Sequence, residues 1–198
     1  MVEAATMHPE GPGSDDTAVS RWFGPAFAHL HPQLQALHRR GGTLQGPLAI
    51  RFGRGLAGVV GRRLARKLGI PADGAAHRLH VAIHHADGLL HWDRRFDDGA
   101  RFVSTFRPYG HWPDGGWIEE TGAVSLRLQV DVVDVGWQWR CIGAQLGRWP
   151  VPLWLLPRTR AGKRIEAGDY RFDVSIALPL LGEVLGYGGL LRAAGGDQ

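Results

Sequence analysis

Two segments in the first third of the chain carry apolar residues at every third or fourth position, which is the spacing of an amphipathic helix. The first runs from about Pro25 to Arg40 and is stopped by a pair of glycines, with Pro32 as a break after its first turn. The second is Leu56–Leu68, which a glycine and a proline end in the usual order. A strand is predicted between them, near Thr43–Phe52. The predicted apolar stripes are Phe27, Leu30, Leu34 and Leu37 in the first helix and Leu56, Val60, Leu64 and Leu68 in the second.

From His77 onward the apolar period changes to two. Apolar and polar residues alternate through Val124–Val130, Trp137–Cys141 and Tyr170–Leu178. Each run can place one side-chain face on a core and the other on polar surroundings, which is typical of strands in an antiparallel sheet. The sequence therefore predicts helices first and antiparallel strands afterwards.

The dipeptide Asp87-Gly88 stands between two alternating runs and predicts a hairpin with a two-residue type I′ turn. This turn fixes how the strands on either side of it pair. A second turn, Asp97-Asp98-Gly99, is read as three residues with a glycine bulge and brings a third strand alongside. The predicted pairs are His84 with His91, Ile83 with Trp92, Val81 with Arg94 and His80 with Arg95 in the first hairpin, and Arg94 with Phe102 and Trp92 with Ser104 in the second.

This register places one charge, Arg94, on an otherwise apolar face, between Trp92 and Phe96. A buried guanidinium needs a partner, because an unpaired charge in the interior is strongly destabilising. Three explanations stay open at this point: an ion pair within the fold, a buried stem whose charged head reaches solvent, and contact with a ligand in a cavity. The candidate ion-pair partners are Glu119, Glu120 and Asp173.

The opposite face of the same hairpin carries three histidines within cross-strand reach, and an aspartate beside them. Imidazole and carboxylate groups are adequate ligands for zinc or another divalent metal. A solvated polar face is the alternative explanation, and we assign no metal on this pattern. The residues are His80, His84, His91 and Asp93.

Length and composition fit one globular domain. The chain has 198 residues, of which 44% are hydrophobic and 21% charged. The domain is predicted over residues 21–192, with a disordered lead at 1–20 and a flexible tail at 193–198. The single cysteine, Cys141, excludes a disulfide framework and a cysteine-based zinc module and is expected to be a buried structural thiol.

Charge and apolar runs limit the expected partners and location. No apolar run is long enough to span a bilayer and no signal peptide is apparent, so we expect a cytoplasmic protein without a membrane span. The net charge of +4 permits weak attraction to nucleic acid or anionic lipid without implying either, and no nucleic-acid partner is expected.

Three weaker features have ordinary structural alternatives. The segment Gly53–Gly58 spells GxGxxG after a strand and before a helix, but the antiparallel strands that follow disfavour a dinucleotide site. The stretch Pro108–Gly116 is either a flap over a cavity or a long loop packed by its own aromatic residues. Two basic groups are each explained by a solvated surface: Arg62, Arg63, Arg66 and Lys67 on the second helix, and Arg158, Arg160, Lys163 and Arg164 in a predicted loop.

Four segments spread over residues 22–192 share their residues with a known family. They are WFGPAFAHLHPQLQALH at 22–38, the GRG-helix segment, HWDRRF at 91–96 followed by RFVSTF, and GDYRFDVSIALPLLGEVLGYGG at 168–189. Together they resemble domain-of-unknown-function family 4166. In that family the domain often follows a saccharopine-dehydrogenase-like or short-chain-reductase portion, so the resemblance implies a separate reductase as a possible partner. It carries no catalytic residue and no cofactor to this chain.

These features together predict an α+β domain: two N-terminal helices packed on a strongly curled antiparallel sheet of about seven or eight strands, which can close partly into a barrel. A curled sheet with an aromatic interior and a few polar groups is a common small-molecule site. We therefore expect a binding domain for an apolar, anionic small molecule, with no cofactor, in which Arg94 pairs the acidic group. The expected walls are Trp92, Phe96, Phe102, Trp137, Trp139 and Phe172.

Two other functions stay open. A cofactor-independent enzyme of the cyclase or isomerase type would use the same cavity and would need an acid or base there. An accessory domain that docks on a separate NAD(P)-dependent reductase would instead have an interior filled by side chains. The acid and base candidates are Glu119, Glu120, Tyr170 and Asp173.

Overall fold

The protein is seen in a computed structural model that describes residues 16–155 and 157–194. The helices are α1 (Ala18–Phe23), α2 (Pro32–Arg40) and α3 (Gly55–Leu68), with short 3₁₀ turns η1 (Gly24–His29) and η2 (Leu153–Leu155). The strands are β1 (Gly42–Phe52), β2 (His77–Ala86), β3 (Leu89–Phe96), β4 (Arg101–Tyr109), β5 (Gly116–Thr121), β6 (Val124–Val133), β7 (Gly136–Leu146), β8 (Trp149–Pro150), β9 (Arg158–Glu166), β10 (Asp169–Leu178) and β11 (Gly182–Ala193).

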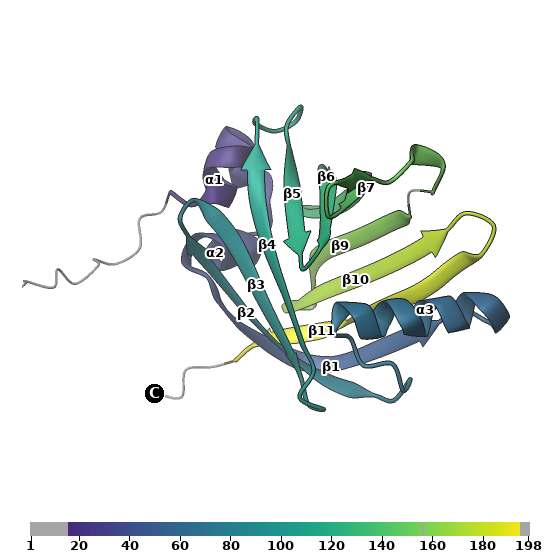
Figure 1. Ribbon diagram of the computed structural model, residues 1–198. Helices are drawn as coiled ribbons and strands as arrows, with labels where there is room; N and C mark the ends of the chain where they lie inside the picture. The colour runs from purple at the N-terminus through teal and green to yellow at the C-terminus, as the bar shows by residue number, and fades with distance from the viewer. Residues whose placement is uncertain (1–15, 156, 195–198) are drawn as a thin grey trace, which may run out of the picture.

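Ten of these strands close into an antiparallel barrel (Figure 1). The order is β6-β5-β4-β3-β2-β1-β11-β10-β9-β7, and β7 pairs back with β6 to complete the ring. The short strand β8 adds to the edge of β7 outside the ring. The α+β class and the curled antiparallel sheet are confirmed, and the sheet closes fully. The estimate of seven or eight strands was too low, since the described part of the chain has 11.

The two turns that were read from the sequence pair the strands as predicted. In the β2–β3 hairpin His84 is opposite His91 and Val81 is opposite Arg94. In the β3–β4 hairpin Phe102 is opposite Arg94. Asp87 and Gly88 both have positive φ, as a type I′ turn requires.

The first helices cover one end of the barrel, which we call the closed end. Pro32 begins α2 and separates it from η1, so the predicted break is confirmed. Helix α1 was not predicted: its residues 18–20 belong to the segment expected to be a disordered lead. Trp22 on α1 contacts the ring of Trp117 on β5, with ring centroids 5.6 Å apart. Positions 1–15 of the lead and 195–198 of the expected tail lie outside the described residues.

The stretch Pro108–Gly116 also belongs to the closed end. The backbone N–H of Trp112 donates to the carbonyl of Trp22, and the Trp22 indole N–H donates to the carbonyl of Tyr109, 3.2 Å away. The stretch is therefore a loop packed by aromatic residues against α1, and of the two readings the flap is wrong.

Helix α3 lies along β11 and β1 (Figure 1). A side chain at Gly61 would collide with the backbone carbonyl of Val184, and one at Gly53 would collide with that of Glu183. Gly53 and Gly61 thus allow a helix to lie directly on a strand. Because the adjoining strands are all antiparallel, the segment is not part of a dinucleotide-binding unit.

The predicted apolar stripe of α3 is not its main packing face. The face against the sheet is made of the small residues Ala57, Gly58, Gly61 and Ala65. Of the stripe, Leu68 lines a cavity inside the barrel, whereas Leu56 is 67% exposed. Small residues form this packing face because only they let the helix approach the strand backbone so closely.

The segment predicted to be a basic loop is strand β9. It lies between β10 and β7 and alternates in burial, so that Lys163 points inward while Arg160 and Arg164 are exposed. The prediction failed because a strand with arginines on its outer face lacks an obvious apolar pattern. As a result, Lys163 was not predicted to lie in the interior.

Candidate functional site

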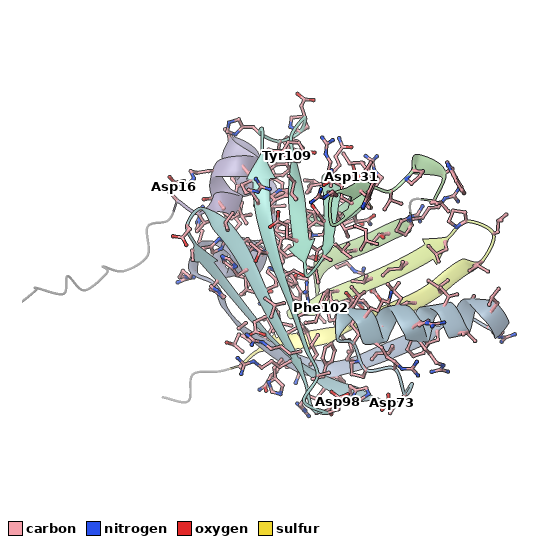
Figure 2. The ribbon with its side chains drawn as sticks, in the orientation of Figure 1. Asp16, Asp73, Asp98, Phe102, Tyr109 and Asp131 are labelled. Atoms are coloured by element: carbon pink, nitrogen blue, oxygen red, sulfur yellow. The ribbon has the colours of Figure 1, made fainter. Side chains whose placement is uncertain are left out.

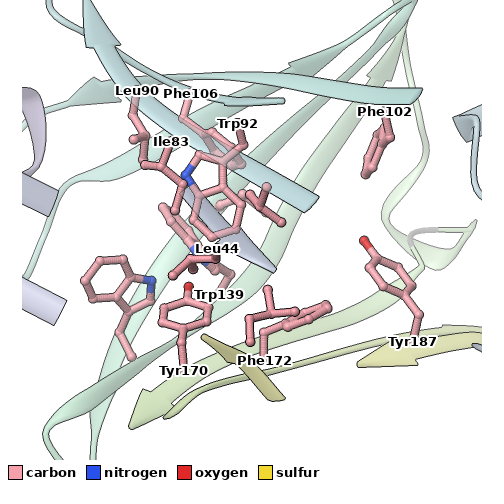
Figure 3. Close-up of a cluster of buried hydrophobic side chains, with 14 of the residues drawn as sticks. Leu44, Ile83, Leu90, Trp92, Phe102, Phe106, Trp139, Tyr170, Phe172 and Tyr187 are labelled. Atoms are coloured by element: carbon pink, nitrogen blue, oxygen red, sulfur yellow. The ribbon is translucent and has the colours of Figure 1, made fainter. Parts of the chain in front are cut away.

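The interior of the barrel is built from aromatic rings on facing strands. Figure 3 shows Trp92 and Phe106 on one side, Tyr170 and Phe172 on the other, and Phe102 opposite Tyr187 farther along. Most of these rings contact one another edge-on, and Phe106 stacks on Trp139. They make a rigid apolar wall around the few polar groups of the interior.

Arg94 is one of these polar groups and is 8% exposed. Its guanidinium donates to the Ser104 hydroxyl at 3.0 Å and lies over the ring of Phe102, 4.5 Å from the centroid. Ser104 in turn lies 3.0 Å from the hydroxyl of Thr121. Within the described residues no carboxylate pairs with Arg94, so the structural ion pair predicted as one explanation is wrong. The guanidinium is contacted by one hydroxyl and two aromatic rings.

Lys163 is the second basic residue of the interior and is 7% exposed. Its Nζ lies 3.5 Å from the centroid of Trp92 and about 5 Å from those of Trp137 and Trp139. The Nζ has no hydrogen-bond partner among the described residues. Burial, and secondarily the charge of Arg94, hold the pKa of the Lys163 amine well below its usual range.

Two cavities lie inside the barrel and share Val174 and Tyr187 as lining residues. The larger, of about 100 Å³, opens toward the end of the barrel near Leu68 and is almost wholly apolar apart from Lys163, Glu119 and two threonines. The smaller, of about 20 Å³, lies deeper and has Arg94 in its wall. An apolar cavity of roughly 150 Å³ holds one benzene ring, so the larger cavity accommodates a somewhat smaller group.

Two tyrosines complete the polar set. Burial raises the pKa of Tyr187 to about 12 and raises that of Tyr170 further, in both cases against an opposing effect of Arg94. The Tyr170 hydroxyl has no partner among the described residues. The interior therefore presents a guanidinium, an amine and two neutral phenols, all of which can donate hydrogen bonds to an anion.

The residues predicted to line a ligand site are all buried inside the barrel, but they divide between the cavities. Phe102 and Trp139 line the larger one. Trp92, Arg94 and Phe172 line the smaller one. Phe96 and Trp137 line neither, and Trp137 packs instead on Phe23 and His38 from the closed end.

Among the predicted acids and bases only Glu119 and Tyr170 face the interior cavities. Glu120 pairs with Arg107 on the outside, and Asp173 accepts a hydrogen bond from Arg171. Cys141 is half-buried, and burial raises the pKa of its thiol, which is the environment of a structural cysteine.

Lys163 is the functional candidate that the sequence analysis missed. One signal could have revealed it: Ala167 and Gly168, which both have positive φ, form a two-residue turn before the clearly alternating strand β10. Counting back from that turn pairs Lys163 with Phe172, an expected interior residue. The pairing argument that was applied to the Asp87-Gly88 turn, if applied to Ala167-Gly168, would have predicted that Lys163 points into the interior.

The histidine face of the β2–β3 hairpin does not form a metal centre. The rings of His84 and His91 stack with centroids 4.9 Å apart, and Nδ1 of His91 lies 3.3 Å from the Thr105 hydroxyl. Across residues 16–155 and 157–194 no three histidine, cysteine or acidic side chains are grouped so that they could hold a metal ion. The face is a polar outer surface of the barrel.

Figure 2 shows charged side chains distributed over the outside of the molecule, with Asp98 and Asp73 at its base and Asp131 near its top. Most exposed acidic groups are paired locally, for example Asp131 with Arg140 at 3.2 Å. Within the described residues no helix is both long and apolar enough to cross a membrane.

Fold and interior together define an antiparallel barrel that is closed by helices at one end and holds a largely apolar cavity with a buried lysine at the other. The family follows from the sequence: the chain belongs to the family described as Domain of unknown function (DUF4166), whose profile matches residues 30–191. No curated protein matches the chain. The predicted family is thus confirmed, and the chemistry has to be argued from the site itself.

Proposed function

We propose that the barrel binds a small molecule with an apolar body and one acidic group. The acidic group would lie between Arg94 and Lys163, and the body would occupy the larger cavity toward the open end. The observation that supports this most is the absence of any carboxylate partner for Arg94 in the described interior, beside a largely apolar cavity. A buried guanidinium without a paired carboxylate is costly for the protein alone, and an anionic ligand would reduce that cost.

The chemistry of the wall restricts the ligand further. The larger cavity touches the rings of Phe102, Phe106 and Trp139, so the part of the ligand inside it is a ring or an alkyl segment. Since the cavity is only about 100 Å³, a longer body would extend into the mouth of the barrel. A carboxylate is expected rather than a bulky phosphate ester, because the deeper cavity at Arg94 is only about 20 Å³.

Decanoate and decan-1-ol are suitable probes because they share an alkyl chain and differ in charge. We expect the protein to bind decanoate more tightly than decan-1-ol in competition with an environment-sensitive fluorescent fatty acid. Arg94→Met should weaken decanoate binding by between about tenfold and a hundredfold, the value of a charge-assisted hydrogen bond, and should leave decan-1-ol nearly unchanged. Equal affinity of the wild-type protein for the two probes would contradict the proposal.

Arg95→Met is the matched control. Arg95 follows Arg94 in β3 but points outward, where it pairs with Asp93. Its substitution should leave both affinities unchanged. Circular dichroism and the unfolding midpoint of each variant show whether an altered affinity reflects the site or the fold.

A cofactor-independent enzyme in the same cavity is the second candidate, and one observation favours it. Glu119 lines the larger cavity together with Lys163, so a carboxylate and an amine border the same apolar space. Such a pair can move a proton to or from a bound substrate. Glu119→Gln separates the two functions: it would abolish turnover of a substrate while leaving decanoate affinity within a few-fold of the wild type.

A further inference from the structure

Large apolar side chains are exposed around the open end of the barrel. Trp149 is 74% exposed, Trp154 73% and Leu180 106%. We call this set the mouth patch and define it as Leu56, Leu146, Trp149, Trp154, Leu155 and Leu180. Soluble domains rarely expose a contiguous group of this kind without a partner.

The members of the mouth patch come from different parts of the chain but surround the same opening. Val124, which lines the larger cavity, pairs with Leu146, and Leu146 pairs with Trp149. Thr159, another cavity residue, follows η2 with its Trp154 and Leu155. Figure 1 shows the β7–β9 connection, the β10–β11 turn and α3 together on one side of the barrel.

Leu180 and Leu56 join the patch from the other side of the opening. Ile176 lines the cavity, and Leu180 is in the turn that follows its strand. The beginning of α3 approaches the same turn, because the backbone N–H of Gly53 donates to the carbonyl of Val184 in β11. The mouth patch is thus continuous with the apolar cavity through the rim of the barrel.

The charges near the mouth patch are mainly positive. Arg148 lies in the turn before Trp149, Arg158 follows η2, and Arg54 precedes α3; all three are exposed and form no ion pair with the described residues. The acidic side chain at this rim, Glu183, accepts a hydrogen bond from Ser175 at 2.6 Å and lies 3.9 Å from Arg51. The surface therefore offers free positive charge beside exposed tryptophans.

We propose that the mouth patch docks on the surface of an anionic phospholipid membrane. Tryptophan favours the boundary between headgroups and acyl chains, and arginine favours anionic headgroups, so both features match one occupant. A second copy of the chain would place three unpaired arginines against three others, which disfavours it. In this position the open cavity faces the lipid, from which an apolar ligand of the kind proposed above could enter without crossing water.

Sedimentation with vesicles tests the docking directly. The full chain is mixed with vesicles of phosphatidylcholine containing one third phosphatidylglycerol, and separately with vesicles of phosphatidylcholine alone. We expect binding to the anionic vesicles, weaker binding to the neutral ones, and marked loss at high salt as the arginines are screened. Trp149→Ser combined with Trp154→Ser should lower partitioning onto anionic vesicles by about tenfold or more.

The matched control is Val133→Ser. Val133 is an exposed apolar residue, 41% exposed, at the end of β6 beside the closed end. Its substitution should leave vesicle binding unchanged. Both tryptophans protrude from the surface, so the double variant is expected to fold, and its unfolding midpoint verifies this.

Three outcomes would overturn the docking proposal. The first is that the folded wild-type chain does not bind anionic vesicles. The second is that Val133→Ser loses as much vesicle binding as the double tryptophan variant. The third is that the chain forms a dimer in solution which the double tryptophan substitution dissociates and which vesicles leave intact. The decanoate measurement is made without vesicles. Failure of membrane docking and failure of ligand binding are therefore separate results.

Discussion

Both ends of the barrel carry tryptophan side chains, which are buried at one end and exposed at the other. At the closed end Trp22 and Trp137 are 2% and 1% exposed, covered by α1, η1 and α2. At the open end Trp149 and Trp154 are each more than 70% exposed. Residue type alone therefore does not decide burial: what decides it is whether another element of the chain reaches that end.

The comparison assigns different tasks to the ends. Rings at the closed end interlock, as in the T-shaped contact of Trp22 with Phe23 at 4.9 Å, and fix the shape of the barrel. The open end retains a cavity and surface rings without partners in the described chain. Stability should therefore depend on the closed end, and ligand or membrane binding on the open end.

The largest expected difference comes from removing a tryptophan at each end. Trp22→Ala deletes a buried ring and its hydrogen bond to Tyr109, and we expect a loss of about 3–5 kcal/mol in the free energy of unfolding. Trp154→Ala, on an exposed ring, should change it by less than about 0.5 kcal/mol. Urea unfolding of both variants measures this, and equal losses would remove the distinction between the ends.

The substitution Lys163→Met tests whether the buried amine in the cavity lowers stability while supporting ligand binding. Methionine can fill the same space and contact the three tryptophans through its sulfur, without a buried amine. We expect the variant to be more stable than the wild type by about 1–2 kcal/mol, and to bind decanoate less tightly, since a site that needs a cation sacrifices stability. A variant that is less stable would show that the amine supports the fold.

The same substitution should change how stability depends on pH. Because the pKa of Lys163 is lowered in the folded protein, the unfolded chain binds more protons below about pH 10, so stability should rise with pH from 7 toward 9.5. Above that range Tyr170 and Tyr187 act in the opposite sense, since burial raises the pKa of both phenols. Lys163→Met should flatten the rise between pH 7 and 9.5 in urea midpoints.

A further expected effect is a pH dependence at the closed end. His38 is fully buried between Trp92 and Trp137, and burial lowers the pKa of its imidazole well below the usual value. Below pH 6.5 only the unfolded chain gains this proton, so stability should fall by up to about 1.4 kcal/mol per pH unit between pH 6.5 and 5. His38→Leu should reduce that slope, leaving the smaller contribution of His85.

His77 provides an internal contrast in the same titration. Hydrogen bonds to Asp73 and Asp97 raise the pKa of His77, so its contribution to stability is complete below pH 6.5 and is lost as pH rises through the raised value. Its effect is therefore constant between pH 5 and 6.5. Any slope in that window that disappears with His38→Leu belongs to the buried histidine.

Local patterns in the sequence predicted local structure well. Asp87-Gly88 fixed a register that holds residue by residue, and it placed Arg94 inside beside Phe102. Full closure of the barrel could not be predicted from local patterns, because the pairing of β1 with β11 joins residues about 150 positions apart, such as Leu44 and Ala193. Lys163 was missed for a different reason: its strand is recognised by the turn at Ala167-Gly168 and not by its apolar content.

The pairing of β1 with β11 also has a consequence for synthesis of the protein. The first strand of the barrel pairs with the last, so a chain emerging from a ribosome leaves one edge of β1 unpaired until β11 has been synthesised. Folding that waits for such distant contacts is slow, and the waiting chain exposes edges on which other chains can aggregate. Production of this protein should therefore benefit from slower translation or abundant chaperones, and any fragment that stops before Gly182 should be insoluble.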